Sequence, residues 1–145
     1  MPRDSPHRPL APEGRARATK ARPKYLGLRA LLFEIRLPLP GWVSILHRLS
    51  GALLFLATVG LLWMLDRSLE SEAGFESVRR YVAHAPVKAV LLLLVWAYCH
   101  HLCAGLRFLA LDLHLGTDRA VARASSVAVF VASLALTAFF GALLW

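Results

Sequence analysis

The chain has 145 residues, of which 57% are hydrophobic, and its formal net charge is +8. Ordinary soluble domains are roughly 45–50% apolar, so a single water-soluble core is excluded as the first expectation. The charge is uneven, because residues 1–48 hold ten Lys and Arg against three Asp and Glu, whereas residues 49–145 hold seven against six.

Two segments precede the first long apolar run. Residues 1–22 are basic, rich in Pro, Arg and Ala and without apolar periodicity, so we expect a disordered tail. The tail lacks interleaved aromatic residues and any reading motif, so nucleic acid is not an expected partner. Residues 23–41 mix apolar and charged side chains and end in Pro38 and Pro40, which predicts a segment on the cytoplasmic membrane surface.

Three apolar runs follow, and each is long enough to cross a hydrocarbon layer of about 30 Å, which needs a helix of about 20 residues. The sequence therefore predicts an all-α membrane protein with three transmembrane helices. We place the helices at residues 42–65, 87–112 and 122–145, with connecting loops at 66–86 and 113–121.

The uneven charge predicts the orientation of these helices. Cytoplasmic segments of membrane proteins carry an excess of Lys and Arg, so the basic N-terminal part is expected in the cytoplasm. The loop at 66–86, with four acidic residues and a possible surface helix at 74–83, would be periplasmic, and the C-terminus also. Asp4 and Glu13 argue against a mitochondrial presequence, so we expect the inner membrane of a bacterium.

The first span opens with a polar stripe. Ser44, His47, Arg48 and Gly51 stand at i, i+3, i+4 and i+7, which places them on one helix face. A guanidinium there can hold a carboxylate bidentately, and a hydroxyl or imidazole can bond a quinone carbonyl. The alternative is that Arg48 and His47 reach lipid phosphate at the interface.

The second span contains His100 and His101, which point about 100° apart around the helix. A neutral imidazole inside a membrane is a candidate haem ligand, although it can also simply bond a neighbouring helix. His101 lies 11 residues before Asp112, roughly 16 Å along the axis, so we expect it near the level of His47 and Arg48. The residues that share its face are Tyr98, Gly105, Phe108 and Asp112.

Two motifs carry a resemblance to a known family. Ser44-Ile45-Leu46-His47-Arg48-Leu49-Ser50-Gly51 resembles the S-I-L-H-R-x-[ST]-G signature of the cytochrome b subunit of succinate dehydrogenase. His101-x-x-x-Gly105-x-Arg107, followed by Asp112, is similar to that family's H-x-x-x-G-x-R-H-x-x-x-D stretch. The resemblance covers about residues 22–145. It departs at Phe108, where many relatives have histidine.

The resemblance implies a membrane-anchoring subunit of succinate:quinone oxidoreductase that has no substrate chemistry of its own. Its three spans would form part of a heterodimeric helical bundle with a second anchor subunit. An iron–sulfur subunit and a flavoprotein subunit would oxidise succinate and pass electrons to this anchor, where quinone is reduced.

It also implies roles for single residues. His101 would be one axial ligand of haem b, with the other axial ligand supplied by the partner anchor subunit. His47 and Arg48 would lie by the haem propionates, and Ser44 and Arg48 would border the substrate ubiquinone. The cytoplasmic end of the second span would be closed by Arg107 and Asp112.

Two other functions fit parts of the pattern. A quinol:fumarate reductase anchor has the same architecture, although the Ser-x-x-His-Arg pattern is more similar to the succinate-oxidising group. A non-redox membrane scaffold would lack both haem absorption and copurifying flavin, so a spectrum of the detergent-extracted protein distinguishes it.

Overall fold

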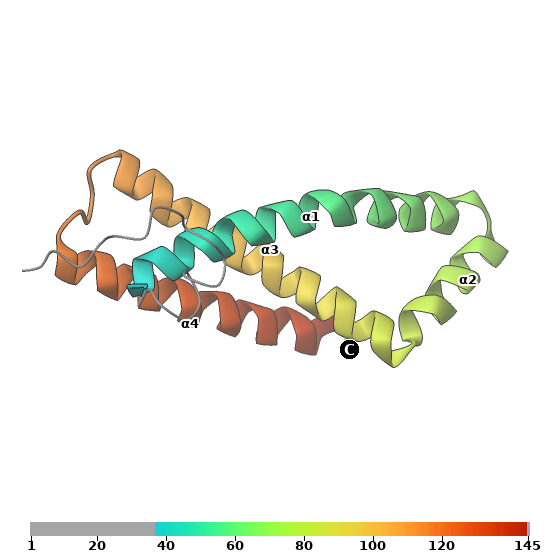
Figure 1. Ribbon diagram of the computed structural model, residues 1–145. Coiled ribbons are helices and arrows are strands. Elements are labelled where there is room, and N and C mark those ends of the chain that lie inside the picture. Colours follow the sequence, from blue (N-terminus) through green and yellow to red (C-terminus); the bar gives the residue numbers. More distant parts are fainter. Residues whose placement is uncertain (1–36, 145) are drawn as a thin grey trace, which may run out of the picture. The chain divides into compact units, whose positions relative to one another are not determined.

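The computed structural model describes residues 37–144, which form four α-helices (Figure 1). These are α1 (Leu39–Glu70), α2 (Glu72–Ala83), α3 (Ala85–Asp112) and α4 (Arg119–Leu144). Three of them, α1, α3 and α4, are long and apolar enough to cross a membrane, which confirms the predicted fold class. The tail expected at residues 1–22 and most of the segment expected at 23–41 lie outside the described residues.

Proline marks the start of two of the long helices. Pro40 lies in the first turn of α1 and Pro86 in the first turn of α3. Proline is tolerated there, because the first backbone N–H groups of a helix have no intrahelical partner and the proline φ angle is already helical. Helix α1 continues to Glu70, past the end of its apolar run, because loss of hydrophobicity does not by itself end a helix.

Helix α2 covers the segment at 74–83 and connects α1 to α3 at one end of the described region. Ser71 has an extended backbone and caps α2, since its hydroxyl accepts a hydrogen bond from the Gly74 N–H at 3.0 Å. A Cβ atom on Gly74 would collide with the Arg67 carbonyl oxygen of α1. Only glycine therefore allows α2 to approach α1 this closely.

The opposite end holds the start of α1, the end of α3 and the start of α4. We call it the inner end, and the α2 end the outer end. The inner turn uses left-handed backbone at His114 and Gly116, with φ angles of 60° and 74°. Helix α4 begins at Arg119, three residues before the span predicted at 122–145, and its first five residues include Arg119 and Arg123.

Helix α3 packs against both α1 and α4 (Figure 1). Its fully buried residues include Ala97 and Ala104, and α4 contributes Ser126 and Ser133. Small side chains at helix contacts let backbones approach closely in membranes, where apolar burial gives little driving force. Val43 of α1, Ala104 and Val129 form the core cluster near the inner end.

Candidate functional site

The two polar motifs of the sequence meet where α1 crosses α3. The imidazole rings of His47 and His101 stack with their centroids 4.2 Å apart and their planes 11° from parallel. His101 Nδ1 lies 3.0 Å from the backbone oxygen of His47 and 3.4 Å from the hydroxyl of Ser50. The sequence placed the two histidines at about the same depth, and in the structure their rings are in direct contact.

Each histidine lies over a glycine of the other helix. A Cβ atom on Gly51 would be 2.8 Å from His101 Cε1, closer than real Cβ atoms approach a neighbour. A Cβ atom on Gly105 would be 3.6 Å from His47 Nε2, an ordinary contact distance. The absent side chain of Gly51 thus makes room for the His101 ring.

Gly51→Ala is expected to lower the thermal stability of the protein, because its methyl group must displace the His101 ring or separate α1 from α3. Overpacking of this kind costs about 1–3 kcal/mol. Gly60→Ala is the control, since no atom lies within 4 Å of a Cβ built there. Thermal unfolding in detergent measures both, and equal stability of the two variants would contradict the close contact.

The hydrogen bond to His47 defines the proton position on His101. A carbonyl oxygen only accepts, so His101 Nδ1 is the donor, and the lone pair of the neutral ring is then on Nε2. Nε2 forms no hydrogen bond to any residue in the described range 37–144. Metal-binding histidines have this arrangement, in which one ring nitrogen is fixed by a carbonyl and the other binds the metal.

Ser44 and Arg48 lie on the surface of α1 near the inner end. One guanidinium nitrogen of Arg48 donates to the Ser44 hydroxyl oxygen at 3.4 Å. Arg48 is exposed and forms no ion pair with a described residue, whereas Ser44 is half-buried. The pair offers a cation and a free hydroxyl proton to whatever covers this face.

Arg107 and Asp112 are not brought together. The buried Arg107 donates to the Ser125 hydroxyl at 2.9 Å and to the Ala122 carbonyl at 3.3 Å, so its guanidinium bonds the start of α4. Asp112 is exposed at the end of α3, and no ion pair joins it to a residue between 37 and 144.

His100 lies apart from the stacked histidines. It is fully buried between the ring of Trp96, at 5.4 Å, and the ring of Phe130 of α4, at 5.6 Å. Neither ring nitrogen has a hydrogen-bond partner among the described residues. The burial leaves no access for a large planar cofactor.

Sequence reasoning missed Ser50 and Ser125, the hydroxyls beside His101 and Arg107. Ser50 is part of the first motif, and its position three residues after His47 was the available signal. Ser125 bonds across helices, so nothing within the second span could have indicated it.

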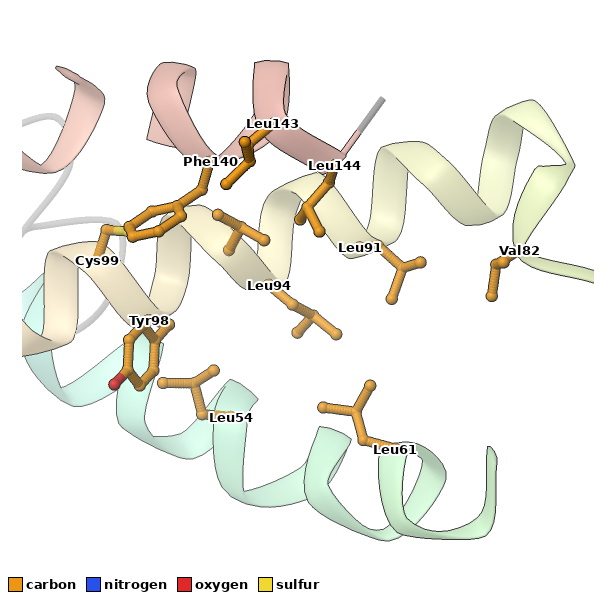
Figure 2. Close-up of a pocket in the computed structure, with 11 residues that line it drawn as sticks. Leu54, Leu61, Val82, Leu91, Leu94, Tyr98, Cys99, Phe140, Leu143 and Leu144 are labelled. Atoms are coloured by element: carbon orange, nitrogen blue, oxygen red, sulfur yellow. The ribbon is translucent and has the colours of Figure 1, made fainter. Parts of the chain in front are cut away.

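An apolar cavity of about 590 Å³ lies on the outer side of the stacked histidines, and Figure 2 shows its lining. Tyr98, one turn from His101, stands among its lining residues. Such a lining suits hydrocarbon and offers no counter-charge to an ion. The labelled lining residues are Leu54, Leu61, Val82, Leu91, Leu94, Tyr98, Cys99, Phe140, Leu143 and Leu144.

Comparison with known proteins gives consistent matches. Residues 19–140 match the family model described as succinate dehydrogenase/fumarate reductase transmembrane subunit. The chain is 30% identical over 115 residues to the succinate dehydrogenase cytochrome b556 subunit of Coxiella burnetii, covering 79% of this chain and 92% of the relative. The corresponding proteins of Rickettsia typhi and Paracoccus denitrificans are 32% identical over 95 residues and 33% identical over 101 residues. These two alignments cover 66% and 70% of this chain and 73% and 78% of the relatives.

Proposed function

Because the chain belongs to the succinate dehydrogenase/fumarate reductase transmembrane subunit family, we propose that it is the haem-carrying anchor of a succinate:quinone oxidoreductase. It would pass electrons from succinate oxidation to ubiquinone and perform no substrate chemistry itself. The observation that carries the proposal is the stacked pair of His47 and His101, with the His101 Nε2 lone pair unused by residues 37–144.

The residues at this contact fit a b-type haem. The His101 ring is oriented by the hydrogen bond from Nδ1 to the His47 carbonyl, and its Nε2 is unused by residues 37–144, which is the arrangement of an axial ligand. His47 and the guanidinium of Arg48 are the groups that would hold the propionates, since Arg binds carboxylates bidentately. Bound haem would supply a one-electron carrier beside the quinone site. The second axial ligand would come from a partner anchor subunit.

Ser44 and Arg48 are the proposed quinone contacts. Arg48 already donates to the Ser44 oxygen, so the hydroxyl proton of Ser44 remains available to a quinone carbonyl. Arg48 would stabilise the negative charge that develops on a quinone oxygen during reduction. Arg107 and Asp112 would contribute less directly, with Arg107 fixing α3 to α4 at the same end.

The proposal includes an orientation and a set of partners. The inner end, where Arg119 and Arg123 begin α4, would face the cytoplasm of a bacterium, in keeping with the positive-inside rule. The C-terminus would then be periplasmic. An iron–sulfur subunit and a flavoprotein subunit would dock at the inner end.

Purification of the complex through this chain tests the function. We expect flavin, iron–sulfur clusters and a b-type haem to copurify, together with succinate:quinone activity. Faster quinol:fumarate turnover than succinate oxidation would assign the reverse reaction. A purified chain without flavin or haem would point to a non-redox scaffold.

A further inference from the structure

Four side chains near the inner end form a row of ring contacts, in which one pair is stacked. His101 of α3 stacks on His47 of α1 at 4.2 Å, and the ring of Phe108 lies 5.1 Å from His47 at an angle of 54°. The guanidinium carbon of Arg107 lies 5.6 Å from the centre of the Phe108 ring. Arg107 is in turn bonded to α4 through Ser125.

His47 of α1 contacts two rings of α3. His101 and Phe108 are seven residues apart on α3, roughly 10 Å along its axis, and both contact the His47 ring. Gly105 lies between them in the sequence, and a Cβ atom built on it would make an ordinary contact with His47 Nε2 at 3.6 Å. The His47 ring is therefore held on one side by His101 and on another by Phe108.

Phe108 provides this contact without offering a hydrogen bond. The ring nitrogens of His47 form no hydrogen bond with residues 37–144, so they remain available to an acidic ligand group. A histidine at position 108 would place a polar ring next to His47 and compete for that nitrogen. Phe108 is half-buried and packs against the core cluster, so the phenyl ring is itself fixed.

We propose that Phe108 is a positioning residue that holds His47 against His101, so that the His47 ring nitrogens are reserved for the haem propionates. This inference rests on the proposed function. Groups that orient a metal site from behind its ligands typically contribute 10–100-fold to metal affinity or activity. We expect Phe108 to contribute at the lower end of that range, because it acts through His47 and not on the iron ligand itself.

The test compares variants of the purified complex by haem retention, haem midpoint potential and the low-spin electron paramagnetic resonance signal. Phe108→Leu removes the ring, and we expect roughly tenfold faster haem loss with a shifted potential. Phe108→Tyr keeps the ring and should match the native complex. Phe130→Leu is the matched control, because Phe130 packs against the same core cluster but contacts His100 and not His47.

A double substitution separates positioning from general loosening. If Phe108 acts through His47, Phe108→Leu should add nothing to the changes already caused by His47→Leu. Equal effects of Phe108→Leu and Phe130→Leu, or additive effects in the double variant, would overturn the proposal while leaving the haem assignment intact. If the Phe108→Leu complex does not assemble, Phe108→His replaces it, because histidine keeps a ring at this position. We expect Phe108→His to shift the haem midpoint potential, and an unchanged potential in this variant would also overturn the proposal. A native complex without haem would remove the proposed function and this inference together.

Discussion

Substitution of His101 by leucine is expected to remove the b-type haem spectrum from the purified complex. Leucine has no lone pair, so the haem would keep only the ligand from the partner subunit. The stack on His47 and the hydrogen bond to the His47 carbonyl would be lost with it. Reduced-minus-oxidised difference spectra measure the result, and we expect the haem content to fall by at least the 10–100-fold typical of disturbed metal sites.

His100→Phe is the matched control for this experiment. His100 is the adjacent residue, but it is fully buried between Trp96 and Phe130 and its ring nitrogens are unpartnered within the described part of the chain. Replacing an unpaired buried polar ring by an apolar ring is expected to be neutral or stabilising. An unaltered spectrum in the His101 variant, or a lost spectrum in the His100 variant only, would show that the ligand is elsewhere.

Arg48→Leu is expected to lower succinate:quinone activity by roughly 100-fold, because groups that stabilise developing oxyanion charge contribute 10²–10³. Ser44→Ala removes a single neutral hydrogen bond and is expected to cost about tenfold. Both variants should retain succinate oxidation with a soluble electron acceptor, since that reaction does not require the quinone site. Steady-state assays of the same preparation with the two acceptors give the ratio of quinone-dependent activity to soluble-acceptor activity, which measures the quinone site.

Arg67→Leu is the control for loss of an arginine from α1. Arg67 lies at the outer end and pairs with Glu70 on the surface, so its removal should leave quinone reduction near the native rate. If Arg48→Leu and Ser44→Ala both retain full quinone turnover, these residues do not line the quinone site. If Arg67→Leu is equally impaired, the loss reflects assembly and not quinone contact.

The sequence predicted the spans well, because the length of an apolar run is a direct consequence of membrane thickness. The first and third helices begin before the predicted spans, and the first also continues beyond its span. Residues 66–70 are polar except for Leu69 but remain helical in α1, and α4 begins three residues before the span predicted at 122–145. Hydrophobicity reports where a chain leaves the hydrocarbon, whereas helix ends depend on capping and on backbone conformation, as at Ser71.

Some contacts of the candidate site could be predicted from the sequence and others could not. The face shared by Ser44, His47, Arg48 and Gly51 follows from helical spacing alone. The contacts of Arg107 with Ser125 and Ala122 do not, because they depend on how α3 is rotated toward α4. Apolar residues surround nearly the whole of α3, so its sequence carries little information on that rotation. Spacing alone predicted that His101 lies near the level of His47 and Arg48. The resemblance to the cytochrome b family, which the comparisons confirm, added the roles expected of these residues.

The length of α1 determines how far it projects from the bilayer. Its 32 residues span about 48 Å, whereas the hydrocarbon layer is about 30 Å thick. Fitting the whole helix inside would need a tilt of roughly 50°, beyond the 0–40° that membrane helices adopt. One end of α1 must therefore stand in the headgroup region or in water. We therefore expect the turn at Ser71 and the charged first half of α2 to be accessible to a protease or a membrane-impermeant label. Access is expected when the reagent is applied from one side of the membrane only.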